Sequence, residues 1–252
     1  MANHSEIIKK TISQKEISNR ERLLALFKKT PIPDIEILDN LVLYCRRQSL
    51  SKLLFMNEIY KKIITVHGII IEFGVRWGQN LAIFESLRGI YEPYNHNRKI
   101  VGFDTFAGFP EFDEKDGAAS VLEKGNFSVS ENYEDYLEDV LSCHEQESPI
   151  SHIQKFQIYK GDASTEIRNF LEKNPQTIIA FAFFDFDLYK PTVECLKAIK
   201  RHLTKGSVLG FDELNVENYP GETIALQEVF GLDQVRIQRN NYGSVQSYIV
   251  IE

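Results

Sequence analysis

Two aspartates, one residue apart, follow an apolar run in "TIIAFAFFDFD", residues 177–187. Charged side chains such as those of Asp185 and Asp187 are rarely buried without partners. Other apolar runs also end in acids, namely Glu72, Asp104, Asp162 and Asp212 with Glu213. If these runs are parallel strands, their carboxyl ends share one edge of the sheet, where ligands bind. Carboxylates gathered there repel one another unless cations or hydroxyl groups lie among them. The pattern therefore predicts a ligand site at that edge.

The carboxylates Asp185, Asp212 and Glu213 favour a hard cation such as Mg²⁺, because no histidine or thiolate accompanies them. A metal at this position lowers the pKa of a substrate hydroxyl and orients its oxygen. Asp187 is the candidate general base, or else a group that holds the metal. Asp185 and Asp187 can both serve one site only if the chain turns at Phe186. The alternative is that Asp187 caps the following helix.

The first turn after a predicted strand reads E-F-G-V-R-W-G, residues 72–78. Gly74 and Gly78 permit a tight turn and a close approach to a ligand. The turn lacks the second glycine of the dinucleotide fingerprint G-x-G-x-x-G. Its spacing, acid-x-Gly-x-x-x-Gly, instead resembles the first motif of Rossmann-like S-adenosylmethionine methyltransferases. The resemblance implies that this turn wraps the amino-acid end of the cofactor.

Two further acids stand where a nucleoside is held in such folds. Asp104 follows the second strand, where an acid accepts hydrogen bonds from both ribose hydroxyls. Asp162 fits the acid that contacts the adenine amino group, and an N-cap for the helix starting near Thr165 is an equally good and compatible alternative. The neighbouring Thr105, Ala163 and Ser164 are predicted to complete the cofactor site.

The elements that must position these residues alternate along the chain. Apolar strands are predicted within 63–75, 98–106, 155–163, 177–187 and 206–214, with helices at 78–90, 164–174 and 191–203. Continuous apolar strands alternating with helices predict an α/β, Rossmann-like parallel sheet covered on both faces. The tail predicts two antiparallel strands, at 234–240 and 247–252, that close one edge.

Residues 1–62 are predicted to form a helical extension to the methyltransferase-like domain at 63–252. Helices are expected at 15–29, at 35–48 with Asp34 as cap, and at 52–63 with Ser51 as cap. Such a prefix packs either on the main domain or on a partner subunit in a homodimer, and the sequence leaves both open.

The segment at about 105–150 is long, acidic and polar, with one expected helix around "YEDYLEDVLSCH". Because it leaves the carboxyl end of the second strand, it is predicted to be a lid or substrate loop. The alternative is a solvated surface helix.

Composition limits the classes of partner. The 252 residues carry a formal charge of −7, which argues against nucleic acid bound through a broad basic surface. The 3 cysteines form no C-x-x-C pair, the first residues lack the apolar core of a signal peptide, and no apolar stretch has the length of a membrane span. We expect a cytoplasmic protein without a membrane span.

With these motifs in view, the chain resembles the macrocin O-methyltransferase family of metal-dependent sugar O-methyltransferases over about residues 68–250. The resemblance rests on "EFGVRWGQN", "GFDTFAGFPEFDEKDG", "KGDAS", "FFDFDLYKPT", "GFDELN" and "YPGETIAL". It implies methyl transfer from S-adenosylmethionine, with Mg²⁺, to a sugar hydroxyl of a glycoside, nucleotide sugar or surface polysaccharide precursor. It also implies that Asp185, Asp212 and Glu213 are metal ligands and that Asp187 lies in the catalytic stretch.

The sequence departs from the family pattern after the fifth strand. The family commonly has a second aspartate where Glu213 stands here, and an aromatic residue where this chain has Leu214. Two rival hypotheses from other classes are an oxidoreductase acting on a nucleotide sugar or using NAD, and a non-catalytic Rossmann-like binding module. The incomplete dinucleotide fingerprint weighs against the first, and the retained acids weigh against the second.

Overall fold

The computed structural model describes residues 13–110, 112–117, 124–243 and 245–252. Parts of the predicted extension (1–12), of the predicted lid (111 and 118–123) and of the tail (244) lie outside the described residues. The chain divides into two compact units, Met1–Lys52 and Leu53–Glu252. The predicted domains 1–62 and 63–252 remain predictions.

The first unit is helical. Helix α2 (Gln14–Lys28) begins with a capping box, in which Ser13 and Glu16 satisfy each other's backbone N–H groups. The predicted continuous helix over 35–48 is wrong: the chain forms α3 (Asp34–Ile37) and a 3₁₀ turn, η1 (Leu41–Tyr44). Between them the Asn40 side chain donates to the Glu36 carbonyl at 2.9 Å, which competes with continuation of the helix.

Helix α4 (Arg47–Ile63) begins four residues before Ser51. The prediction that Ser51 caps this helix is therefore wrong, and Ser51 lies within its first turns. The helix ends at Ile63, as predicted, and the first strand begins at Ile69 after an irregular segment at 64–68.

The second unit contains a seven-stranded sheet in the order β3-β2-β1-β4-β5-β7-β6. Five strands are parallel: β1 (Ile69–Phe73), β2 (Ile100–Asp104), β3 (Phe156–Lys160), β4 (Ile179–Phe184) and β5 (Leu203–Phe211). The tail strands β6 (Gln238–Arg239) and β7 (Ser247–Val250) are antiparallel at one edge. The predicted mostly parallel sheet with an antiparallel C-terminal edge is confirmed.

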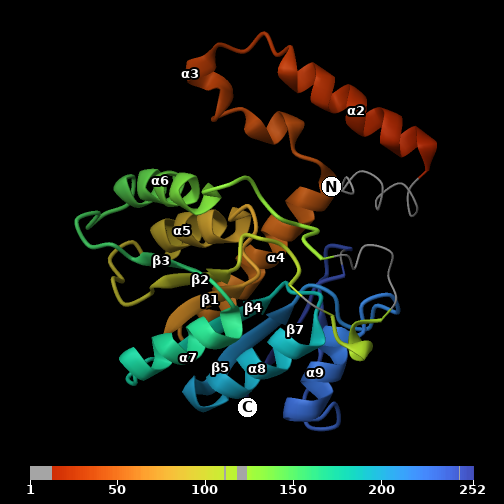
Figure 1. The fold of residues 1–252 in the computed structure, drawn as a ribbon. Helices are drawn as coiled ribbons and strands as arrows, with labels where there is room; N and C mark the ends of the chain where they lie inside the picture. Colours follow the sequence, from red (N-terminus) through yellow and green to blue (C-terminus); the bar gives the residue numbers. More distant parts are fainter. Residues whose placement is uncertain (1–12, 111, 118–123, 244) are drawn as a thin grey trace. The chain divides into compact units, whose positions relative to one another are not determined.

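Helices cover both faces of this sheet (Figure 1). The end of α4 packs with α5 (Gln79–Tyr91) and α6 (Tyr133–Gln146) on one face. On the other face lie α7 (Ala163–Lys173), α8 (Tyr189–Ile199) and α9 (Gly221–Phe230). Two short 3₁₀ turns lie in the connections: η2 (Glu114–Asp116) between β2 and α6, and η3 (Lys200–His202) between α8 and β5. Every residue of β4 is buried, which explains its unbroken apolar sequence.

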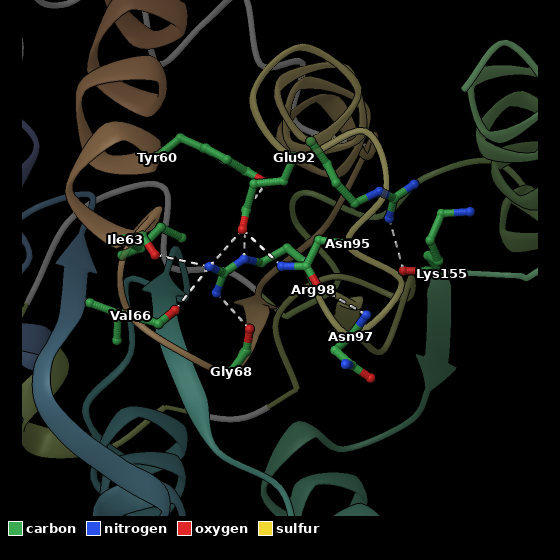
Figure 2. Close-up of polar contacts among 10 residues, drawn as sticks. Tyr60, Ile63, Val66, Gly68, Glu92, Asn95, Asn97, Arg98 and Lys155 are labelled. Atoms are coloured by element: carbon green, nitrogen blue, oxygen red, sulfur yellow. Dashed lines mark hydrogen bonds and ion pairs between the residues drawn. The ribbon is translucent and has the colours of Figure 1, made fainter. Parts of the chain in front are cut away.

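A buried arginine joins three elements where β1 begins (Figure 2). Arg98 is 1% exposed and donates to the carbonyls of Ile63, Val66 and Gly68 at 2.6–2.9 Å. Its Nε also pairs with Glu92 at 2.8 Å. Burial alone would raise the pKa of Glu92, but hydrogen bonds from Arg98, Tyr60 and Asn95 outweigh it and lower that pKa. Arg98 therefore fastens the end of α4 to the start of β1 and the end of α5.

A second buried charge cluster lies where α5, α6 and β3 meet. Arg88 donates to Glu145 at 3.1 Å and to the Lys155 carbonyl at 3.2 Å, and Lys155 also pairs with Glu145. Glu85 is 1% exposed beside them, and neither of its carboxylate oxygens has a hydrogen-bond partner. Burial raises its pKa to about 8.

None of the helices in the described ranges is both long and apolar enough to cross a membrane.

Candidate active site

Backbone hydrogen bonds continue beyond the strand ends and hold the acid-bearing loops side by side. The Asp185 N–H donates to the Phe73 carbonyl at 2.9 Å, and the Asp212 N–H donates to the Phe184 carbonyl at 3.0 Å. The loops after β1, β4 and β5 therefore leave the sheet from neighbouring positions, as predicted. Strands β2 and β3 are added on one side of β1, and β4 and β5 are added on its other side. The boundary between β1 and β4 is therefore the topological switch point, where open α/β sheets bind ligands.

The loops after β1 and β4 touch through their backbones at Gly74. Its φ is +90°, and a Cβ built there would stand 2.1 Å from the Asp185 carbonyl oxygen. Only glycine fits this position without strain. We call this Gly74–Asp185 contact the β1–β4 seam. Gly78, at φ +73°, has a different neighbour, because a Cβ there would meet the Leu137 side chain of α6 at 2.3 Å.

Asp104 is held by the turn after β1. Its Oδ2 accepts from the Arg76 N–H at 2.7 Å, and its Oδ1 accepts from the Phe106 N–H at 2.6 Å. Burial raises the pKa of Asp104, and the charge of Asp185 raises it further, although these N–H bonds oppose the rise. A carboxylate offers about four lone-pair sites. Asp104 therefore retains acceptor capacity for hydroxyl groups.

The same turn carries Asn80 and Arg76, which sequence reasoning missed, beside Glu72, whose predicted cofactor role remains a prediction. Asn80 donates to Glu72 Oε1 at 2.5 Å, and both side chains are buried. The Asn80 Oδ1 and the Arg76 Nε are buried without a hydrogen-bond partner. An unpaired buried acceptor and donor beside Asp104 fit the ammonium and carboxylate of an amino-acid ligand. The signal in the sequence was their place within "EFGVRWGQN".

The Arg76 guanidinium lies 4.7 Å from the centre of the Phe127 ring. Burial lowers the pKa of Arg76, while the charges of Asp185, Asp187 and Asp104 raise it. Arg76 thus shares one electrostatic environment with the acids that follow two strands, β2 and β4.

Asp162 caps α7, as the compatible alternative predicted: its Oδ2 accepts from the Thr165 N–H at 3.1 Å and from the Thr165 hydroxyl at 2.7 Å. Ala163 and Ser164 are buried in the first turn of α7, and Ser164 hydrogen-bonds Cys195 of α8. Thr105 accepts from the Ala107 N–H at 3.2 Å within the loop after β2. The cofactor roles of these four residues remain predictions.

The chain turns out of the sheet directly after β4, as the double-aspartate motif required. Asp187 has a φ of +60°, which is uncommon for a residue other than glycine. Helix α8 has Leu188 at its N-cap with no side-chain capping bond. The alternative that Asp187 caps this helix is therefore wrong. Left-handed backbone at a non-glycine residue stores strain and clusters at functional sites.

Asp212 and Glu213 follow β5. Gln246, beside β7, donates to Asp212 Oδ1 at 2.6 Å, a contact the sequence did not indicate. The Glu213 Oε2 is buried without a hydrogen-bond partner. Burial, followed by the charges of Asp212 and Asp185, raises the pKa of Glu213 to about 7. These three carboxylates therefore repel one another at close range, which favours a cation between them.

The side chains nevertheless do not form a finished metal site. Within the described ranges, no group of three or more His, Cys, Asp or Glu side chains is arranged to hold a metal ion. The donor set suits Mg²⁺ in its chemistry, and the orphaned Glu213 oxygen fits a cation. The ligand set Asp185, Asp212 and Glu213 remains a prediction.

Two residues of the "YPGETIAL" stretch lie at this cluster and were not predicted. Burial raises the pKa of Tyr219 to about 12, with the charges of Glu213 and Asp187 adding to the effect. Glu222, in the first turn of α9, is fully buried. Burial raises its pKa well above the usual value, and the charges of Asp187, Asp212 and Asp185 raise it further.

The start of the predicted lid is anchored to the loop after β4. Asp116 accepts from the Tyr189 N–H at 2.5 Å, and Lys115 donates to the Tyr189 hydroxyl at 2.8 Å. Helix α6 buries Leu137 and Leu141 against α5, so it is more than a solvated surface helix. Its role as part of a lid remains a prediction.

Neither a family model nor a curated relative matches the chain. Among solved structures, one described as CalS11, calicheamicin methyltransferase, is 42% identical, with a TM-score of 0.92 over 95% of this chain and 93% of that chain. The chain belongs to the macrocin O-methyltransferase family. It is an S-adenosylmethionine-dependent O-methyltransferase, which decides against the oxidoreductase and the non-catalytic module.

Two further structures are similar to this chain, one at the level of the family and one at the level of the fold. An apo structure of CalS11, described as a TDP-rhamnose 3'-O-methyltransferase in calicheamicin biosynthesis, is 39% identical, with a TM-score of 0.84 over 95% of each chain. The O-methyltransferase NovP is 17% identical, with a TM-score of 0.57 over 80% of this chain and 79% of that chain. NovP supports the fold alone.

Proposed function

We propose that this protein transfers the methyl group of S-adenosylmethionine, with Mg²⁺ bound, to a hydroxyl group of a nucleotide-linked sugar. The observation that carries the proposal is the β1–β4 seam. On one side of this seam is the turn after β1, which carries unpaired buried polar groups. On the other side are the loops after β4 and β5, whose carboxylates repel one another. A methyl donor held on one side of the seam faces an acceptor held on the other.

On the donor side, the turn at 72–80 surrounds the amino-acid end of the cofactor, with Asn80 Oδ1 and Arg76 Nε available to the ammonium and carboxylate. Asp104 accepts hydrogen bonds from the ribose hydroxyls, and Asp162 contacts the adenine. Because the sulfonium methyl is already activated, alignment is the main contribution of these residues.

On the acceptor side, Asp185, Asp212 and Glu213 hold Mg²⁺, which when bound acidifies the acceptor hydroxyl. Asp187 removes the hydroxyl proton, and its strained backbone fixes the direction of its carboxylate. In the transfer, the acceptor oxygen would bond to the methyl carbon in line with the carbon–sulfur bond, which would break and release S-adenosylhomocysteine. The described parts of the predicted lid, 105–110, 112–117 and 124–150, would cover the site and exclude water that would compete for metal coordination.

A nucleotide-linked sugar is our first choice of acceptor because CalS11, at 39% identity, is described as acting on TDP-rhamnose. Glycosides and surface polysaccharide precursors are the other candidates. We also infer a cytoplasmic location, since Cys45, Cys143 and Cys195 are free thiols, which suits a reducing compartment.

Calorimetry and methyl incorporation test the proposal together. S-adenosylmethionine should bind with and without Mg²⁺, and label should pass to TDP-rhamnose only with Mg²⁺. Failure to bind the cofactor would contradict the donor site, and label passing only to a glycoside or glycan fragment would overturn the choice of acceptor.

A variant pair tests the carboxylates. Asp185→Asn should lower turnover at least tenfold and weaken Mg²⁺ binding while cofactor binding persists, because one ligand charge is lost. Asp139→Asn, on the exposed side of α6, makes the same chemical change and should behave as the unmodified enzyme. If Asp185→Asn keeps full turnover and metal dependence, the metal assignment is wrong.

A further inference from the structure

The buried carboxyl group of Glu222 contacts two acid-bearing loops, the loop after β4 and the loop after β5. Glu222 Oε1 accepts from the Phe186 N–H, and Glu222 Oε2 accepts from the Glu213 N–H, both at 3.3 Å. Phe186 is the residue between Asp185 and Asp187, and Glu213 directly follows Asp212. One side chain therefore spans the loop after β4 and the loop after β5.

The position of Glu222 is set by the start of α9. Gly221, the first residue of that helix, lies so close to the loop after β4 that a Cβ there would stand 2.6 Å from the Tyr189 nitrogen. Helix α9 is thus pressed against the segment Leu188–Tyr189. The next side chain, Glu222, is 0% exposed and reaches beneath both loops.

A carboxylate is an unfavourable choice for this position if filling space were its task. Burial, followed by the charges of Asp187, Asp212 and Asp185, raises the pKa of this carboxyl group well above its usual value, so placing an ionisable group here costs free energy. A leucine or methionine of similar volume would avoid that cost. What the carboxylate supplies and an apolar side chain does not is a pair of acceptors for two backbone N–H groups.

We propose that Glu222 is a positioning residue, which sets the separation of the two acid-bearing loops by binding the Phe186 and Glu213 amides with its two oxygens. That these loops hold the metal and the acceptor rests on the proposed function. The two hydrogen bonds from the loops to Glu222 are independent of that function. Glu222 touches neither donor nor acceptor and acts through the carboxylates on either side of it.

The first experiment needs no ligand. Hydrogen exchange of the full chain, read on peptides containing residues 186 and 213, should be faster in Glu222→Gln, because the amide nitrogen of glutamine cannot accept a hydrogen bond. The control is Glu217→Gln, an exposed glutamate in the loop that precedes α9, with the same change of charge. Equal exchange in the two variants would overturn the proposal.

The second experiment separates positioning from general stability. Glu222→Gln and the apolar Glu222→Met should lower kcat tenfold or more and raise the Mg²⁺ concentration needed for half-maximal rate. The KM for S-adenosylmethionine should stay within about twofold, since the donor residues follow β1, β2 and β3. A side chain that merely filled the core would leave kcat intact in the methionine variant, and that outcome would contradict the proposal.

The two proposals fail in distinguishable ways. If the unmodified enzyme shows no methyl transfer or no metal dependence, the proposed function is wrong, and the exchange experiment still decides whether Glu222 holds the two loops. If the unmodified enzyme is active and metal-dependent while both Glu222 variants match Glu217→Gln in kcat and metal requirement, the positioning role is wrong.

Discussion

Glu85 shows what one buried carboxyl group does to the pH dependence of stability. Burial raises its pKa to about 8, from a usual value of 4.5, although Arg88 and Lys155 oppose the rise and Glu145 adds to it. The folded protein therefore keeps a proton that the unfolded chain releases. As the pH rises from about 4.5 to about 8, this group subtracts progressively from the free energy of unfolding.

Glu85→Gln should remove that loss. At pH 8 the free energy of unfolding of the variant should exceed that of the unmodified protein by about 1 kcal/mol or more. Its unfolding temperature should then be roughly 2–4 °C higher. Near pH 5 the two should be alike. Scanning calorimetry across this range measures the difference. Glu138→Gln, exposed on α6, is the control and should show no pH-dependent gain. A Glu85→Gln variant that loses stability at pH 8 would show that the carboxylate is ionised and paired.

Gly74 offers a second test at the scale of a single residue. Gly74→Ala should abolish most activity and destabilise the fold by about 1–3 kcal/mol or more, because the new methyl group meets the Asp185 carbonyl and φ is +90°. Gly243→Ala has the same kind of positive φ, +75°, with nothing near its Cβ, and isolates the backbone strain. Thermal unfolding and turnover are the measurements. Equal effects of the two substitutions would show that the close approach at Gly74 contributes nothing to stability or activity beyond the backbone strain.

At the scale of elements, Arg98 connects parts of the chain that the sheet alone does not join. Arg98→Met should destabilise the protein by about 3–5 kcal/mol, because it leaves Glu92 charged and buried and removes the donors to three carbonyl oxygens. Arg236→Met, at an exposed site, should change the free energy of unfolding by less than about 0.5 kcal/mol. Denaturant unfolding measures both. Partial recovery in the double variant with Glu92→Gln is also expected.

The sequence predicted the sheet and its acidic edge because both depend on local patterns. Continuous apolar runs marked the buried parallel strands, and the residue after each run marked the edge. The turn at Phe186–Asp187 matches the condition that the sequence set for Asp185 and Asp187 to serve one site, and the shared site itself remains a prediction.

Other features depended on contacts between distant segments and were missed. Gln246, next to β7, contacts Asp212, which is 34 residues away. Glu222 of α9 contacts Phe186, 36 residues away, as well as the nearer Glu213. The broken helix at 34–44 was missed for a local reason, because Asn40 binds the Glu36 carbonyl with its side chain. Periodicity reports which face is apolar and does not report such competing hydrogen bonds.

At the scale of the whole molecule, the first unit exposes large apolar side chains. Ile35, Leu38 and Val42 are 73–89% exposed, and none of residues 13–50 is buried. Apolar surface of this kind is typical of an interface. Such an interface forms either with the second unit or with a second copy of the chain. We propose the second copy, in a homodimer, for which light scattering gives twice the 29.1 kDa chain mass.

The paired change Leu38→Glu with Val42→Glu should convert that dimer to a monomer, because charge replaces apolar surface. The matched pair Lys15→Glu with Lys28→Glu on α2 alters charge without removing apolar surface and should stay dimeric. A monomeric unmodified protein would contradict the expectation.

The backbone contact between Gly74 and Asp185 also has a consequence for the order in which ligands assemble. Nothing compressible separates the donor turn from the acid loop, so a donor that tightens one displaces the other. Binding of the sulfonium cofactor and binding of the divalent ion are then expected to be coupled, and thermodynamic reciprocity requires each ligand to change the affinity for the other by the same factor.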